Sequence, residues 1–198
     1  MFFYPTPKLK LFQAKKTLTF YNILWYNIDK LKHLQASINP VLKGGLLMRY
    51  VLCVSFGNTC RSAMFQMLFC EALQNRKIFD VQVESAGTSK AANLAKPANK
   101  HSITCMRERG LDLQGHRSRW INELDLQKYD LVLCMNQVQY NYLKVRGVPV
   151  DKILIIDTNN QGEIPYPKQT SLPAHRRCVK VLEEAINDII ARICIMKG

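Results

Sequence analysis

The sequence lacks any long apolar run. A helix that spans a membrane needs about 20 consecutive apolar residues. The longest candidate, from Phe20 to Ile28, is interrupted by Asn22 and Asn27 and is followed by Asp29. Internal repeats and low-complexity tracts are missing as well. These absences argue against a membrane-spanning chain and against a repeat array, so we expect no membrane partner.

The cysteines show no sign of metal or disulfide chemistry. All 7 are scattered along the chain, and none has the C-x-x-C spacing that is typical of zinc sites. Cys53 and Cys134, for example, each lie between two apolar neighbours. This pattern is typical of reduced, buried thiols and not of a secreted disulfide framework. We therefore expect a cytoplasmic protein that holds no metal ion and no cofactor.

Length and charge set further bounds. A chain of 198 residues is long enough for one compact domain and short for two. The formal net charge of +13 would suit a nucleic-acid partner, but the basic residues are dispersed among acidic ones and form no run. We expect a surface suited to small anionic ligands, no nucleic-acid partner, and a monomer.

The first 47 residues differ from the rest. They contain seven lysines, no arginine and a single acidic residue, Asp29. They resemble neither an Arg-rich and Ser-rich mitochondrial leader nor a secretory signal with a compact apolar centre. Met48 directly precedes a clear strand pattern. Our hypothesis is that residues 1–47 are disordered or a gene-model extension; the alternative is a basic, aromatic tail that contacts a membrane surface or a partner.

From residue 48 to residue 198 the chain alternates between strand and helix patterns. Short apolar runs predict strands at residues 49–54, 81–85, 130–135 and 153–156. Amphipathic segments predict helices at residues 62–75, 98–109, 137–145 and about 173–195. Such alternation favours an α/β domain in which helices cover both faces of a parallel sheet.

The most informative segment joins the first predicted strand to the first predicted helix and reads VLCVSFGNTCRS from Val51 to Ser62. A loop of this kind can turn successive backbone N–H groups towards an anion at the positive end of a helix. The guanidinium of Arg61 could clamp two phosphate oxygens. By itself, a Gly-Asn pair before a helix is also compatible with an ordinary strand-to-helix turn.

The whole segment resembles the signature loop of the low-molecular-weight protein-tyrosine phosphatases, V-C-[LV]-G-N-[IT]-C-R-S-P. Three further motifs fall where that family has similar ones: Ser85 in ESAGT, His116 in GHRSR, and residues 130–135 in DLVLCM. The resemblance covers residues 48–198. It implies a three-layer α/β fold with a four-stranded parallel sheet flanked by helices.

The resemblance also implies roles for individual residues. Phosphate would be bound by the loop residues Phe56, Gly57, Asn58, Thr59, Cys60, Arg61 and Ser62. In family members, the positions of Asn58, Ser62, Ser85 and His116 form a hydrogen-bonded network that holds the loop rigid. Tyr166 follows a proline at the position where the family has an aromatic wall of the substrate cleft.

The nucleophile of the family reaction is replaced. In the family, a cysteine six residues before the arginine attacks phosphorus, and that position here is Ser55. A serine hydroxyl is a far weaker acid than a thiol and needs an adjacent base to attack. Cys53 lies two residues too early, in the strand, and Cys60 matches a family cysteine that is not the nucleophile. We expect Ser55 to be inert.

The general acid is replaced as well. The family's D-P-[FYW] motif aligns with residues 164–166, which places Ile164 where the aspartate belongs. Glu163 is one residue away from that position and would point elsewhere. Asn136 also replaces the aspartate of the family's C-M-D motif, and Ala63 replaces the proline that follows the loop. We expect Ile164 to be inert.

We therefore interpret the chain as a pseudophosphatase that binds phosphate or a phosphotyrosine-bearing protein without appreciable turnover. Three alternatives stay open. The first is an active phosphatase that hydrolyses phosphomonoesters weakly through Ser55. The second is an arsenate reductase, which shares the fold but also needs the missing loop cysteine. The third is an interaction protein that has no ligand.

Overall fold

The computed structural model describes residues 48–156, 164–167 and 171–195. Its strands are β1 (Arg49–Ser55), β2 (Val81–Gly87), β3 (Leu131–Cys134) and β4 (Ile153–Ile155), and its helices are α2 (Arg61–Asn75), α3 (Lys100–Arg107), α4 (Gln137–Val145) and α5 (Leu172–Ile195). Four short 3-10 helices are η1 (Lys90–Leu94), η2 (Ile121–Glu123), η3 (Leu126–Lys128) and η4 (Val150–Lys152). The hypotheses about residues 1–47 and Glu163 concern residues outside this description.

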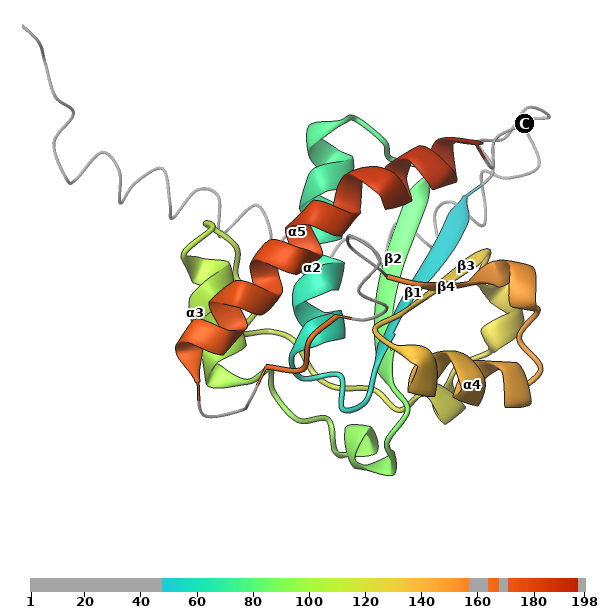
Figure 1. Cartoon of the computed structure of the whole chain (residues 1–198), viewed down its shortest axis with the longest axis horizontal. Coiled ribbons are helices and arrows are strands. Elements are labelled where there is room, and N and C mark those ends of the chain that lie inside the picture. The colour runs from blue at the N-terminus through green and yellow to red at the C-terminus, as the bar shows by residue number, and fades with distance from the viewer. Residues whose placement is uncertain (1–47, 157–163, 168–170, 196–198) are drawn as a thin grey trace, which may run out of the picture. The chain divides into compact units, whose positions relative to one another are not determined.

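The four strands form one parallel sheet in the order β2-β1-β3-β4. Helices α2 and α5 cover one face, with α3 beside α5, and α4 covers the other (Figure 1). This arrangement confirms the predicted three-layer α/β fold with a four-stranded parallel sheet.

Strand β1 is buried on both faces because successive side chains of a strand point to opposite sides of the sheet. Val51 and Cys53 pack in one core with side chains of α2 and α5. Leu52 and Val54 pack in a second core that includes Leu143 of α4. A strand with both faces covered reads as a continuous apolar run, which is why the sequence signal for β1 is strong.

The observed ends of helices and strands differ from the predicted ones where a side chain caps a helix or where pairing between strands extends a strand. Helix α3 begins two residues later than predicted because Asn99 caps it, accepting a hydrogen bond from the His101 backbone N–H at 2.9 Å. Strand β2 continues past Ser85 to Gly87, where it still pairs with Ser55 at the end of β1. The longer strand brings β2 against the loop that follows β1.

The carboxyl ends of parallel strands gather at one edge of a sheet, and in open α/β sheets ligands bind outside that edge. Here the edge carries the loop from Ser55 to Ser62, which we call the phosphate loop. Within the described ranges, no helix has the length and apolar character needed to cross a membrane. The monomeric state and the cytoplasmic location stay predictions from the sequence.

Candidate phosphate-binding site

The phosphate loop joins the end of β1 to the start of α2. Its left-handed turn is made by Asn58, with φ of 53°, and not by Gly57. Asparagine adopts this region more readily than most residues. At the N-cap of α2, the Cys60 side chain makes no capping hydrogen bond, and the first turn of the helix carries no acidic residue. The positive end of α2 is therefore not neutralised by an acidic residue of its own first turn.

The side chain of Asn58 connects the phosphate loop to its surroundings. Its Nδ2 donates to the Ser62 Oγ at 3.0 Å and to the Ser85 Oγ at 2.9 Å. Its Oδ1 accepts from the backbone N–H of Arg119 at 2.9 Å. Asn58 is buried, and both of its amide hydrogens as well as its oxygen are used. These bonds determine the orientation of the amide.

His116 supports the same residue from outside the loop. Its Nε2 lies 2.6 Å from the Asn58 carbonyl oxygen, and because a carbonyl only accepts, Nε2–H is the donor. Burial lowers the pKa of His116, with smaller contributions in the same direction from the charges of Arg119 and Arg117. The ring is therefore neutral near pH 7. The structure thus joins Asn58, Ser62, Ser85 and His116, the residues for which the resemblance implied a shared network.

Two contacts that support the loop were missed in the sequence. The Ser85 Oγ donates to the Gln66 Oε1 at 2.6 Å. Gln66 stands four residues after Ser62, one turn along α2, so helical spacing could have pointed to it. The backbone N–H of Asn99 donates to the Thr59 carbonyl at 2.8 Å. Nothing in the local sequence around Asn99 signals that contact.

Gly87 is a third support that the sequence did not reveal. A Cβ added at Gly87 would lie 2.8 Å from the Phe56 carbonyl oxygen and 2.8 Å from the Ala92 Cβ. Real Cβ atoms essentially never come that close to another atom, so only glycine lets β2 approach the phosphate loop here. The residue lies in the motif that pointed to Ser85, but its role depends on a neighbour far away in sequence.

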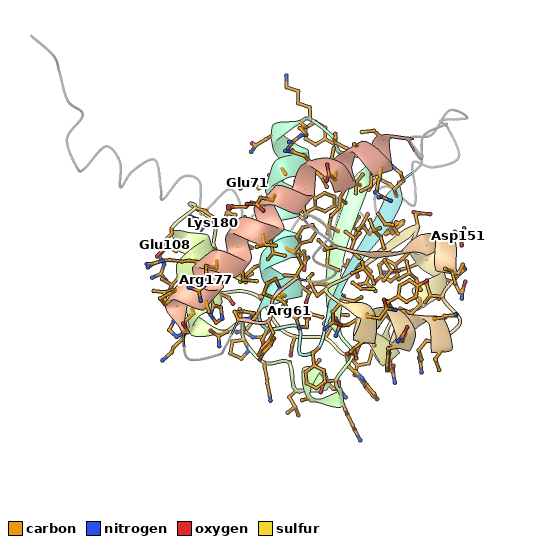
Figure 2. All side chains as sticks on the ribbon, in the orientation of Figure 1. Arg61, Glu71, Glu108, Asp151, Arg177 and Lys180 are labelled. Atoms are coloured by element: carbon orange, nitrogen blue, oxygen red, sulfur yellow. The ribbon has the colours of Figure 1, made fainter. Side chains whose placement is uncertain are left out.

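Arg61 is the first residue of α2 (Figure 2). Its side chain is buried. Its Nη1 donates to the Ile164 carbonyl at 3.1 Å, and its guanidinium carbon lies 5.1 Å from the centroid of the Tyr166 ring. Tyr166 itself is 53% exposed. The arginine of the loop thus links the start of α2 to residues 164–166, and it places an exposed aromatic ring beside the guanidinium.

Ser55 is buried at the end of β1, at the start of the phosphate loop. Its Oγ lies 2.7 Å from the Ser62 Oγ and accepts from the Asn58 backbone N–H at 3.3 Å. In the part of the chain that the structure describes, no carboxylate and no imidazole is bonded to this hydroxyl. A hydroxyl without an adjacent base remains a weak nucleophile.

Two more of the replaced positions, Ile164 and Asn136, are tied into the fold. The Ile164 backbone N–H donates to the Met135 carbonyl at 2.9 Å, and the Ile164 side chain is fully buried in the core that contains Val51 and Cys53. The Asn136 Oδ1 accepts from the Gln139 N–H at 3.2 Å and so caps α4. Neither side chain offers an acidic proton.

The thiols near the loop are poor nucleophiles. Burial is the main cause that raises the pKa of Cys60, although Arg61, Thr59 and Ser102 act in the opposite direction. Burial also raises the pKa of Cys53, which lies inside β1. Both therefore remain protonated near neutral pH. In the described part of the chain, no group of three or more His, Cys, Asp or Glu side chains could hold a metal ion.

Comparison with known proteins relates the chain to a family of phosphatases. The sequence model of the family described as "Low molecular weight phosphotyrosine protein phosphatase" matches residues 50–195. The "Probable low molecular weight protein-tyrosine-phosphatase EpsP" of Ralstonia nicotianae is 24% identical over 148 residues, which is 74% of this chain and 97% of that protein.

Two solved structures are similar. The low molecular weight protein tyrosine phosphatase from T. tengcongensis has 28% sequence identity and a TM-score of 0.66, covering 73% of this chain and 99% of that one. A mutant of the arginine phosphatase YwlE, in which serine replaces cysteine and the active-site serine is phosphorylated, has 26% identity and a TM-score of 0.63. It covers 73% of this chain and 95% of that one.

Proposed function

This chain belongs to the low molecular weight phosphotyrosine protein phosphatase family, and on that premise we propose that it binds phosphate or phosphotyrosine at the phosphate loop without appreciable turnover. The observation that carries this proposal is a contrast within one site. The network around Asn58 is complete, whereas Ser55 has no base among its bonded partners and Ile164 has no proton to give. Binding and chemistry are separable, and among the described residues of this site only the groups for binding occur.

Three features favour binding of a phosphate dianion. The N-terminal end of α2 carries a partial positive charge and backbone N–H groups that have no acceptor within the helix. Arg61 carries five N–H donors, and the bond to the Ile164 carbonyl orients its guanidinium. The neutral Ser55 hydroxyl does not repel an anion as a thiolate would. The exposed ring of Tyr166, beside Arg61, could stack against a phenyl group and so favours an aryl phosphate.

Two absences argue against turnover. Displacement of a phenol needs a nucleophile that is activated and an acid that protonates the leaving oxygen. A positioned acid contributes about 10²–10⁴-fold to the rate, and the Ile164 side chain lies in an apolar core. The raised pKa values of Cys53 and Cys60 further support the view that neither thiol takes over from Ser55.

Binding is tested by thermal unfolding of the full chain with and without phosphate or sulfate. A ligand at about 100 times its Kd stabilises the folded state by about 2.7 kcal/mol. We expect a rise in Tm for the natural sequence and none for Arg61→Ala. Arg146→Ala is the matched control, because Arg146 is exposed at the end of α4, on the opposite edge of the sheet. An equal rise in the Arg61 variant would place the anion elsewhere and contradict the proposal.

A second candidate function is a single phosphoryl transfer to Ser55. The YwlE mutant provides the specific observation, since its active-site serine is phosphorylated. In this step the Ser55 Oγ bonds to phosphorus, the bond from phosphorus to the aryl oxygen breaks, the hydroxyl proton passes to a phosphate oxygen, and water protonates the released phenolate. Without a base for the second step, the phosphoserine would persist.

Mass spectrometry after incubation with an aryl phosphate tests this candidate. The expected result is one added phosphoryl group on the peptide that contains Ser55, and none in Ser55→Ala. An unmodified peptide in the natural sequence, under conditions where phosphate binding is saturated, would contradict it.

A further inference from the structure

Exposed lysines border the phosphate loop on one flank. The backbone N–H groups of Ser89 and Asn99 each donate to a carbonyl of the loop, at 2.9 and 2.8 Å. Lys90 and Lys100 directly follow these two donors, and both are exposed. The hydrogen bonds therefore hold the backbone of both lysines next to the loop.

Two more cations lie on the same flank. The backbone N–H of Ser118 donates to the Lys96 carbonyl, and the Lys96 N–H donates to the Ser118 Oγ, both at 2.9 Å. Pro97 and Arg117 form an antiparallel bridge, so Lys96 and Arg117 lie on adjacent segments. Arg117 follows His116, whose ring is bonded to the loop. Lys96 and Arg117 are both exposed.

We call this group of four side chains the cationic rim: Lys90, Lys96, Lys100 and Arg117. No acidic residue occurs between Glu84 and Glu108, the stretch that carries its three lysines. Within the described residues, none of the four takes part in an ion pair. By contrast, Arg119, close to the rim in sequence, is paired with Glu84 at 3.0 Å. The rim is thus a concentration of positive charge that the described residues leave uncompensated.

The opposite flank of the phosphate loop has a different character. Its described residues include Asn136, Ile164 and the exposed Tyr166, none of which carries a charge. Phe56, in the loop itself, is 58% exposed. A phosphate in the loop would therefore have the exposed Tyr166 ring on one side and four cations on the other.

We propose that the cationic rim recognises acidic residues next to the phosphorylated tyrosine of a partner protein. This inference rests on the proposed function, because the phosphate in the loop sets the position of the segment. With the tyrosine ring beside Tyr166, the neighbouring residues of the segment lie along the rim, where their carboxylates are complementary in charge. Residues 1–47 of this chain, with seven lysines and one acidic residue, have the wrong charge to occupy it.

The expected size of the effect follows from the exposure of the rim. Exposed ion pairs each contribute little, so all four together should change the Kd by about tenfold. Because exposed charges are screened within about 8 Å at physiological salt, the preference should be strong at low salt and nearly absent at high salt. Its main kinetic signature should be a faster association.

Fluorescence polarisation of labelled peptides tests the proposal on the full chain. Four peptides of equal length are compared: phosphotyrosine among Asp and Glu, phosphotyrosine among Ser and Ala, the acidic peptide without phosphate, and phosphotyrosine among Lys. Titrations are run at about 50 mM and about 500 mM salt. The test variant replaces all four rim residues by alanine; Lys144→Ala/Arg146→Ala, on the opposite edge of the sheet, is the control.

We expect the acidic phosphopeptide to bind about tenfold more tightly than the neutral one at low salt, and the rim variant, but not the control, to lose this preference. Neutral and acidic phosphopeptides that bind equally would overturn the inference while the proposed function stands. Binding of no phosphopeptide at all would overturn both.

Two further outcomes would also overturn the inference. One is that the acidic peptide without phosphate binds as well as the phosphorylated one. The other is that vesicles containing phosphatidylserine, or a single-stranded RNA, compete as well as the acidic phosphopeptide does at equal charge. The comparison among peptides on the natural sequence needs no variant, so it remains decisive if the fourfold variant fails to fold.

Discussion

Two sets of residues meet at the phosphate loop, and their surroundings differ. The support set consists of Asn58, Ser62, Ser85 and His116, which are linked to one another by hydrogen bonds. The reaction set consists of Ser55 and Ile164, the positions that the resemblance assigns to the nucleophile and the general acid. Ile164 fills a core instead, and Asn136, which replaces a further aspartate of the family, caps α4.

The difference shows which constraints folding imposes at such a site. A buried polar group that loses its partner costs about 1–3 kcal/mol, so the support set can hardly change one residue at a time. Replacing a thiol by a hydroxyl of similar size, or a carboxylate by an apolar side chain that reaches the core, carries no such penalty. A complete support set therefore indicates a loop that is held in one conformation, and it does not by itself indicate catalysis.

The largest expected effect is a gain of activity when the reaction set is rebuilt. Ser55→Cys places a thiol at the end of β1, where the N-terminal end of α2 and Arg61 favour the thiolate. We expect slow hydrolysis of aryl phosphates whose leaving group needs no proton. Adding Ile164→Asp should raise the rate for poorer leaving groups by about 10²–10⁴-fold, because the acid acts on the same reaction coordinate.

Ile164 packs in the core, so an aspartate there will be partly desolvated and will lower the stability. Tm and phosphate binding of the double variant must therefore be measured beside its activity. Ile164→Asp alone should remain inactive and serves as the control. A double variant that folds, binds phosphate and stays inert would show that position 164 is not the acid position.

The next effect concerns stability and compares the two sets directly. Asn58→Ala removes the donor to Ser62 and Ser85 and the acceptor for the Arg119 N–H, and it puts alanine at a positive φ. We expect a loss of about 3 kcal/mol in the free energy of unfolding. Ser55→Ala removes one hydroxyl and should cost about 1 kcal/mol. Urea unfolding measures both, and equal losses would contradict the distinction between the sets.

A smaller effect is expected from pH. Burial lowers the pKa of His116, so the unfolded chain takes up a proton below its usual pKa of about 6.5 while the folded chain resists it. Stability should therefore be constant above that pH and fall as the pH drops through it. The pKa of His175 is also lowered, mainly by burial, and adds a change of the same sign.

Replacing His116 by glutamine separates the two histidines, because the amide keeps a donor for the Asn58 carbonyl. Urea unfolding between about pH 5 and about pH 7.5 should show a shallower dependence for His116→Gln than for the natural sequence. His175 contributes to the remaining slope. If the pH dependence of stability is the same in His116→Gln as in the natural sequence, His116 does not contribute to it.

The smallest expected effect is that of removing residues 1–47. Both sets, and every described strand and helix, lie from Arg49 onward. A chain that starts at Met48 should differ from the full chain by less than about 0.5 kcal/mol in the free energy of unfolding. A large loss of unfolding free energy on removing residues 1–47 would show that this segment stabilises the domain. The stability of the two sets would then depend on more than the domain that begins at Arg49.

The sequence predicted the fold well and the site in part, for physical reasons. Strand β1 was clear because both of its faces are buried, and helix ends were missed where a cap such as Asn99 decides them. The loop motif pointed to Asn58 and Arg61 because their chemistry is specific. The role of Gly87 could not be predicted, since it depends on how closely a distant backbone approaches.

The core position of Ile164 was also not foreseen. Its alignment with an acidic position indicated only that a carboxylate is missing. The structure adds that the side chain packs in the main core while the carbonyl accepts from Arg61. Ile164 thus contributes its backbone to the site and its side chain to the core. The sequence gives no signal of this division, because the pattern of apolar residues is the same whether the side chain points into the core or towards the site.

Steady-state hydrolysis of an aryl phosphate tests the central claim most directly. The full chain is repurified until its specific activity is constant, and its rate is compared with that of Arg61→Ala under conditions where phosphate raises the Tm of the natural sequence. The account predicts equal rates for the two proteins at the level of the buffer. A rate that clearly exceeds the Arg61→Ala rate and follows the protein through repurification would show that Ser55, or another group at the loop, performs catalysis.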